Sequence, residues 1–441
     1  MKDEHCHLAI DRGLSLGAEF VEARIHKVST ESLVYKNGEL QPISQYVEEG
    51  LGIRILVDGT LGFCSINTLS ETAITEIVEK LYKITSASHK INKNEINFAD
   101  ENSVDIEYQV SEKTKWQDIP LKTKTEYLDE LDVSIRERDK IKFAARLIEL
   151  DRRVDEKTYI TSDGTSVKSK IPRVGVFYFL TGVEGANSIQ RFNHRGGSGG
   201  WEILADQKVN EVLTEDANAM EKVLLHGKKA PDKKLDLIVG GEIAGIIAHE
   251  SVGHPSETDR ILGREAAQAG ESYMTVKSLE KQIGSEEVNV SDDPTLPSSY
   301  GYYLYDDEGT KAKKRNIVTQ GMITEFLHNR DTAARFEISS NGSSRAMSYS
   351  VEPIIRMANT FFEPGNYDFE EMLEGIKEGV YMKSFMEWNI DDRRVNQRYT
   401  GMEAYMIENG EITYPIKSPI LEITTQELLQ ALVARGKNLD F

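Results

Sequence analysis

Turn dipeptides between alternating apolar runs are the feature that most constrains how this chain folds. An asparagine or aspartate followed by glycine separates two such runs at three places, Asn37-Gly38, Asp58-Gly59 and Asn409-Gly410. These dipeptides favour the type I′ turns that join antiparallel strands. A fourth pair of runs, residues 317–320 and 322–326, surrounds Gly321. The sequence therefore predicts β-hairpins at both ends of the chain.

Helices are predicted over residues 4–16, 71–84 and 123–138, but they do not alternate regularly with the strands. This favours an α+β fold, with mixed strand-rich domains and flanking helices, over a doubly wound parallel sheet. Residues 87–111 are polar and unperiodic and predict a linker. The glycine-rich run 195–200 predicts a loop over a groove; a phosphate-binding loop is the alternative, although the run lacks P-loop spacing.

The length of 441 residues predicts two or three domains. Residues 228–234 are charged, contain a proline and precede an apolar strand, which is typical of a domain boundary. We expect an N-terminal α+β region over residues 1–226, with sub-units at about 1–95 and 112–226. Residues 227–441 would form the C-terminal domain.

The charge balance disfavours some classes of partner. Lys and Arg number 53 and Asp and Glu 73, which gives a net charge of −20. Nucleic acids and anionic membrane surfaces both require a basic face, so neither is an expected partner. The first residues lack the pattern of a signal peptide, and two cysteines cannot build a disulfide scaffold. We therefore expect a cytoplasmic protein.

The most informative segment is residues 235–254, which predict a buried strand, a glycine turn and a helix. Glu250 and His254 fall on the apolar stripe of that helix, and His249 borders it. Three ionisable groups on a face expected to be buried would cost several kcal/mol if unpaired. A metal ion would satisfy both imidazoles and leave the glutamate beside it; packing or surface histidines are the alternative.

The spacing of the two histidines makes a specific structural demand. His249 and His254 are five residues apart, which on an ideal helix places them about 140° from each other. One extra residue in the turn, a π-bulge, would return both to one face. Gly253, immediately before His254, makes such a loosening of the helix plausible.

Residues 249–254, His-Glu-Ser-Val-Gly-His, resemble the HExxxH motif of the TldD/PmbA family, and in particular its TldD branch. Glu257 and Asp259 follow the motif. Further segments are similar to that family across nearly the whole chain, namely Tyr305-Asp306-Asp307-Glu308-Gly309, Arg356-Met357-Ala358-Asn359-Thr360, Gly52-Ile53-Arg54 and Glu403-Ala404-Tyr405.

This resemblance implies a zinc-dependent peptidase that hydrolyses unfolded peptides or small proteins in the cytoplasm. It implies Zn²⁺ ligation by His249 and His254, with Glu250 as general base towards water at the metal. Glu257 and Asp259 are candidates for orienting a ligand histidine, with a surface acid pair as the alternative. The resemblance also implies a dimer, formed either with a second copy or with a metal-free paralogue.

The same resemblance implies a third zinc ligand, a cysteine near the C-terminus. Neither Cys6 nor Cys64 matches that position. We therefore expect a C-terminally shortened chain or a member that lost the ligand, with weak metal binding. The rival hypothesis is a catalytically silent subunit that binds peptides or scaffolds a partner. A DNA-binding regulator is disfavoured by the net charge of −20.

Overall fold

The computed structural model describes residues 2–92, 94–265 and 270–439. Helices and strands are mixed along the chain without regular alternation, which confirms the predicted α+β class. In the described part of the chain, no helix is both long and apolar enough to cross a membrane.

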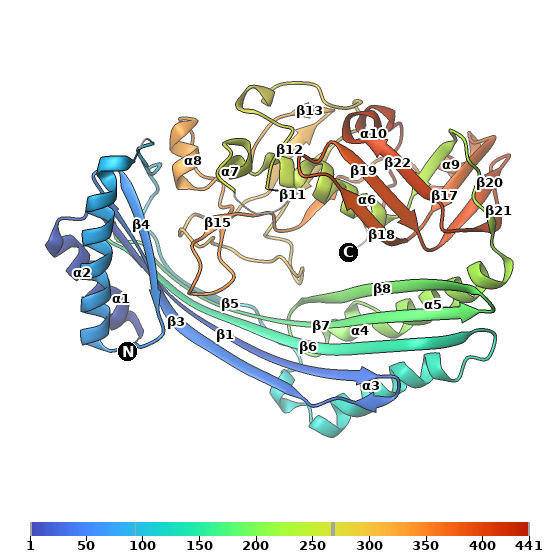
Figure 1. The fold of residues 1–441 in the computed structure, drawn as a ribbon, viewed down its shortest axis with the longest axis horizontal. Coiled ribbons are helices and arrows are strands. Elements are labelled where there is room, and N and C mark those ends of the chain that lie inside the picture. The colour runs from blue at the N-terminus through green and yellow to red at the C-terminus, as the bar shows by residue number, and fades with distance from the viewer. Residues whose placement is uncertain (1, 93, 266–269, 440–441) are drawn as a thin grey trace.

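The N-terminal half builds one large curved sheet (Figure 1). Its strand order is β4-β3-β1-β6-β7-β5, with β2 paired to β1 and β8 paired to β7. Strands from both predicted N-terminal sub-units meet in it, because β1 pairs with β6 along most of its length. The strands are β1 (Phe20–Lys36), β2 (Glu39–Leu40), β3 (Ser44–Val57), β4 (Thr60–Ile66), β5 (Asp105–Gln109), β6 (Lys142–Thr161), β7 (Ser166–Glu184) and β8 (Asn187–Ser198).

The predicted hairpin turns are confirmed. Two consecutive residues with positive φ define a type I′ turn, and glycine, asparagine and aspartate adopt that conformation at little cost. The φ angles are 54° and 87° at Asn37 and Gly38, 47° and 66° at Asp58 and Gly59, and 51° and 81° at Asn409 and Gly410.

Helices cover the two ends of this sheet and bury its apolar residues (Figure 1). At one end, α1 and α2 pack on β1, β3 and β4. At the other end, α3, α4 and α5 pack on β6, β7 and β8. These helices are α1 (Lys2–Leu16), α2 (Glu71–Ser88), α3 (Leu121–Arg136), α4 (Ile203–Asp206) and α5 (Val209–His226).

Two sequence expectations about irregular segments were wrong. The expected linker, residues 87–111, contains β5, which pairs in parallel with β7. The expected glycine loop, residues 195–200, continues strand β8 through Ser198. A Cβ at Gly196 would lie 2.7 Å from the Val174 carbonyl oxygen, and one at Gly197 would overlap that of Ser298. The glycines therefore permit close backbone packing instead of forming a ligand loop.

The C-terminal half consists of smaller sheets and short helices. A five-stranded sheet runs β10-β17-β20-β21-β9, a second runs β13-β12-β11-β16, and a third runs β18-β19-β22. The strands are β9 (Lys228–Lys229), β10 (Asp236–Val239), β11 (Val290–Asp292), β12 (Arg315–Thr319), β13 (Met322–Ile323), β14 (Ser344–Arg345), β15 (Ile354–Ile355), β16 (Thr360–Phe362), β17 (Glu378–Met382), β18 (Phe385–Ile390), β19 (Asn396–Gly401), β20 (Ala404–Glu408), β21 (Glu411–Lys417) and β22 (Ile420–Thr424). The helices are α6 (Gly241–Ala248), α7 (Thr258–Ile261), α8 (Arg330–Arg335), α9 (Phe369–Glu374) and α10 (Thr425–Ala431).

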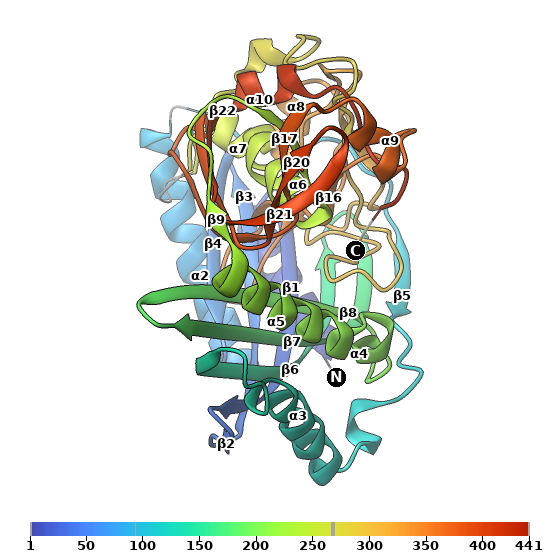
Figure 2. The same cartoon turned by 90° about the vertical axis from the view of Figure 1, so that its right-hand side faces the viewer.

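Buried ion pairs connect the large sheet to the C-terminal elements, which lie over one of its faces (Figures 1 and 2). Arg54 of β3 bonds Glu22 within the sheet and Glu308 of the C-terminal half at 2.8 Å. Lys157 of β6 donates to both carboxylate oxygens of Asp307, each at 2.8 Å. The acidic segment 306–308 therefore joins the two halves.

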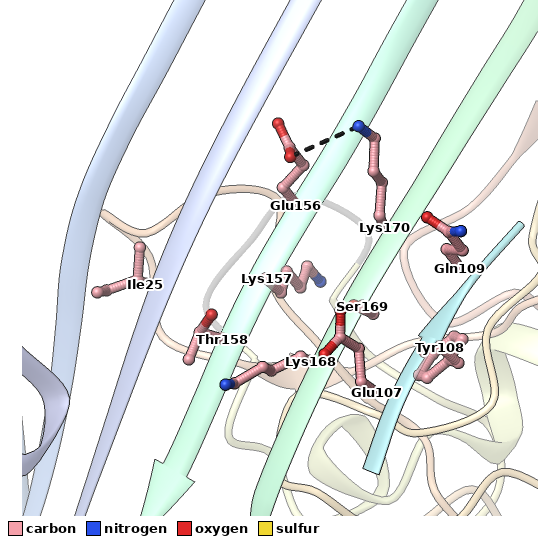
Figure 3. Close-up of a pocket in the computed structure, with 10 residues that line it drawn as sticks. All are labelled: Ile25, Glu107, Tyr108, Gln109, Glu156, Lys157, Thr158, Lys168, Ser169 and Lys170. Carbon is pink, nitrogen blue, oxygen red and sulfur yellow. Dashed lines mark ion pairs between the residues drawn. The ribbon is translucent and has the colours of Figure 1, made fainter. Parts of the chain in front are cut away.

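A small cavity of about 270 Å³ lies against strands β5, β6 and β7 (Figure 3). Its charged lining is mixed, since Lys170 lies 3.8 Å from Glu156, and Lys168 bonds Asp3. None of its lining residues belongs to the histidine segment of residues 249–254.

Candidate metal centre

The histidine segment directly follows strand β10 and helix α6, as the sequence predicts. A Cβ at Gly240, between them, would overlap the Lys383 carbonyl oxygen, so only glycine allows this close approach. Ile243 and Ile247 are buried in a core that includes Met382 of β17. This packing fixes the axis of α6 and directs its C-terminal end towards the site.

The predicted widened turn is present. Residues 249–253 form a π-helical turn directly after α6. It brings the His249 and His254 Nε2 atoms to 3.1 Å from each other, with ring centroids 4.5 Å apart. The two imidazole rings therefore meet despite their five-residue spacing, because the turn contains one extra residue.

Gly253 is required where the π turn meets the neighbouring core. A Cβ at this position would overlap the Sδ of Met357 and lie 3.2 Å and 3.3 Å from its Cγ and Cε. Met357 is buried and packs with Val252 of the same turn. The glycine thus lets the turn lie directly on this core.

Glu250 lies beside the two imidazoles but is engaged elsewhere. His249, Glu250 and His254 each offer a ligand atom, and these atoms lie within 4.8 Å of one another. Glu250 is buried and forms an ion pair with the guanidinium of Arg394. The carboxylate is therefore held in a fixed orientation at the edge of the histidine pair.

The expectation that all three ionisable groups are buried was wrong for His249, whose side chain is exposed. Enough protein nevertheless surrounds the ring that lost hydration, together with repulsion by His254, lowers the pKa of His249 to about 4. The imidazole is therefore neutral at pH 7, the form that binds metals.

Glu257 contacts the candidate ligand His254. Its Oε2 lies 3.1 Å from the His254 Nδ1, and the side chain is fully buried. Arg260 bonds the same carboxylate and Arg356 lies 3.5 Å away. Burial alone raises the pKa of Glu257, but the contact with His254 and these cations keep it below its ordinary value. A carboxylate on Nδ1 leaves Nε2 free to face a metal.

The structure places Asp259 away from both histidines. Its carboxylate faces Arg356 at 3.9 Å, in a group with Glu257 and Glu265. Burial, and then repulsion by Glu257, raise the pKa of Asp259 to about 7.

The two imidazole nitrogens match two of the four ligand positions of a zinc ion. Two nitrogen ligands of a tetrahedral zinc ion lie about 3.3 Å apart, close to the 3.1 Å seen here. Of the described residues grouped with them, Glu250 alone offers a third ligand atom. Cys6 of α1 and Cys64 of β4 pack with the core at the far end of the large sheet.

Sequence reasoning missed Arg394. It lies in the turn between β18 and β19, 144 residues after Glu250, and its position depends on the packing of a separate sheet. The only signal in the sequence is a polar turn, Asp391-Asp392-Arg393-Arg394, which by itself indicates a solvent-exposed hairpin end.

Family models match the chain over three segments. They describe PmbA/TldA metallopeptidase domain 1 at residues 21–85, the central domain at 114–225 and the C-terminal domain at 232–441. The chain therefore belongs to the PmbA/TldD family of metallopeptidases, which confirms the resemblance seen in the sequence.

Individual proteins agree with this assignment. Metalloprotease MJ0996 of Methanocaldococcus jannaschii is 30% identical over 431 residues, which cover 98% of this chain and 92% of that protein. A protein of Saccharolobus solfataricus named zinc metalloprotease TldD homolog is 27% identical over 443 residues, covering 97% and 91% of the two chains.

Solved structures share the fold at low sequence identity. TldE from Thermococcus kodakarensis superposes with a TM-score of 0.73 at 18% identity, covering 97% of this chain and 92% of its own. A Thermotoga maritima protein, named for a proposed role as modulator of a DNA gyrase, gives 0.80 at 18% identity, with 99% and 95% covered.

Proposed function

We propose that this protein is a zinc-dependent peptidase whose metal is held by His249 and His254. The convergence of the two Nε2 atoms through the π turn is the observation that carries the proposal. Membership of the family and relatives named as metalloproteases support it. When bound there, zinc would polarise a scissile carbonyl and lower the pKa of water at the site.

The chain's own residues have separable roles in this proposal. Glu250 accepts a proton from the attacking water and passes it to the leaving amine. Glu257 fixes the His254 ring through Nδ1, at 3.1 Å. Asp259 would act on His254 only indirectly, through Arg356, which also lies 3.5 Å from Glu257.

We further propose unfolded peptides or small proteins as substrates, in the cytoplasm, and a dimer with a second copy or with a metal-free paralogue. The similarity of the fold to TldE supports a partner of the same architecture. The division into residues 1–226 and 227–441 is kept as a proposal, with the metal site in the second part.

A second candidate function is a catalytically silent peptide-binding or scaffold subunit. The ion pair between Glu250 and Arg394 favours it, because it engages the proposed base. The small number of ligand atoms also favours a silent subunit, because in the described part of the chain only two imidazoles and this carboxylate converge.

Zinc content and peptide hydrolysis decide between these functions. The purified protein and its His249→Ala/His254→Ala variant are compared, each alone and with a candidate partner subunit. The peptidase predicts stoichiometric zinc and cleavage of unstructured peptides in the parent, and loss of both in the variant. Equal zinc content in the two proteins would refute the site, and zinc binding without cleavage in either preparation would support the silent subunit.

A further inference from the structure

The π turn that brings the two imidazoles together needs support from outside its own segment. Turns of this kind are rare, because α-helical hydrogen bonding is the usual state of a helical backbone. In that usual state, two residues five apart lie about 140° from each other on the helix. His249 and His254 therefore meet only if other contacts favour the π form over the α form.

Pro255, directly after the second histidine, opposes the α form. In a regular α-helix the amide of residue 255 would bond the carbonyl oxygen of Ser251, four residues earlier. Proline has no N–H, and in an α-helix its ring clashes with that same carbonyl. The Ser251 carbonyl oxygen, which belongs to a fully buried residue, therefore needs a donor from elsewhere.

Tyr273 supplies this donor. Its hydroxyl donates a hydrogen bond of 2.7 Å to the Ser251 carbonyl oxygen. The preceding residue, Ser272, donates from its own hydroxyl to the Pro255 carbonyl oxygen, also at 2.7 Å. Both residues lie in the irregular segment between α7 and β11. This segment thus bonds the backbone on both sides of His254.

Gln397 of β19 holds the side chain of the same serine. Its Nε2 donates to Ser251 Oγ at 2.6 Å and also to the Thr425 hydroxyl. Its Oε1 accepts a hydrogen bond from the Tyr399 hydroxyl. Gln397 is only 3% exposed. Because both polar atoms of the buried amide are engaged, its orientation towards the π turn is fixed.

Both the carbonyl and the hydroxyl of Ser251 are therefore bonded by residues that are remote in the sequence. We propose that Tyr273 and Gln397 are positioning residues of the metal centre, which hold the π turn in the form where His249 and His254 meet. This proposal rests on the proposed zinc site. Without these two hydrogen bonds the turn loses its support and the imidazoles separate.

The experiment uses the full-length protein and removes one hydrogen bond at a time. Tyr273→Phe deletes only the hydroxyl, and Gln397→Met replaces the amide with an apolar group of similar length. Tyr303→Phe is the matched control, because the Tyr303 hydroxyl likewise donates to a backbone carbonyl, that of Gly342, at 2.8 Å. Denaturant unfolding gives the stability of each variant. If Gln397→Met does not fold, Tyr273→Phe carries the test by itself.

Three quantities are measured. Zinc affinity comes from competition with a chromophoric chelator, and the visible absorption of the Co²⁺-loaded protein reports the geometry of the ligands. Amide hydrogen exchange over residues 249–256 is followed in the metal-free protein, where it reports local opening of the turn.

Tyr273→Phe and Gln397→Met should each lower zinc affinity by about 10- to 100-fold. Both should change the Co²⁺ spectrum and speed exchange over residues 249–256. Tyr303→Phe should leave all three quantities at the parental values, even where it lowers overall stability. A merely structural role of Tyr273 would lower stability without changing the Co²⁺ spectrum.

Zinc affinity and exchange at parental values in Tyr273→Phe would overturn this inference while leaving the peptidase function standing. An equal loss of zinc affinity in Tyr303→Phe would also overturn it, because the effect would not be specific to the turn. A parent that binds no zinc, in which Tyr273→Phe still speeds exchange over residues 249–256, would support the hold on the turn and refute the zinc site. Absence of zinc binding together with unchanged exchange would overturn both.

Discussion

Replacing Gly253 with alanine tests how the π turn positions His254. The new methyl would overlap the Sδ of Met357, and the adjacent Cγ and Cε lie at only 3.2 and 3.3 Å. The backbone itself tolerates alanine, since φ is −60° and ψ is −65°. Any loss of stability therefore comes from the contact with Met357 and not from the conformation of the chain.

The magnitude follows from two opposing effects. Overpacking of a buried site typically costs about 1–3 kcal/mol. Exchange of glycine for alanine in a compatible conformation contributes about 0.4–1 kcal/mol in the other direction. Gly253→Ala should therefore lower the free energy of unfolding by about 1–2 kcal/mol. Because His254 is the next residue, zinc affinity should fall by about tenfold or more.

A double mutant separates the contact from other effects. In a Met357→Ala background the obstructing side chain is gone, so adding Gly253→Ala should be neutral or stabilising. Denaturant unfolding of the four proteins gives the coupling energy, and competition with a chromophoric chelator gives the zinc affinity. If Gly253→Ala destabilises equally in both backgrounds, the close contact with Met357 is not what requires glycine.

Three further outcomes follow from the buried charges. Glu250→Gln should retain zinc but lower the rate of peptide hydrolysis by about 10²–10⁴-fold, whereas an unchanged rate would exclude it as the base. Arg54→Ala leaves Glu22 and Glu308 buried without their cation, and denaturant unfolding should show a loss of about 3–5 kcal/mol. Because burial and Glu257 raise the pKa of Asp259 to about 7, above its unfolded value of 3.8, its neutral form contributes stability below about pH 4 that is lost as pH rises to 7. Asp259→Asn should reduce this loss of stability with rising pH and raise the free energy of unfolding by up to about 4 kcal/mol at pH 8. An unchanged dependence of stability on pH would show that Asp259 is not buried as a neutral acid.

The hairpins and the π turn could be predicted because each is specified locally. Asn37-Gly38 and Asp58-Gly59 favour their turns through their own φ preferences, whatever surrounds them. The five-residue interval between His249 and His254 likewise requires an extra residue if both rings are to meet. Local geometry was sufficient in these cases because no distant residue was needed to set it.

Other features depended on contacts that a single sequence does not reveal. Strand β5 is polar and alternates weakly, and it becomes a strand only because β7 offers a free edge to pair with. The glycine run of β8 indicated a loop from sequence alone. The reason for the glycines is close packing against other strands, for example against the Val174 carbonyl, and the sequence does not show these neighbours. The exposure of His249 was likewise not predicted, because periodicity at helical spacing places this residue only at the border of the apolar stripe.

The site combines a local part and a remote part. The histidines and Glu250 come from one continuous segment, fixed by the packing of α6 and by the glycine at 253. Arg394 comes from a hairpin turn that Asp391 stabilises internally, and Gln397, just after this turn, donates a hydrogen bond to Ser251 of the histidine segment. The orientation of Glu250 therefore depends on a second sheet as well as on its own segment, because the ion pair with Arg394 links the two. Sequence reasoning missed Arg394 for this reason, since its contact with Glu250 exists only once the two sheets pack together.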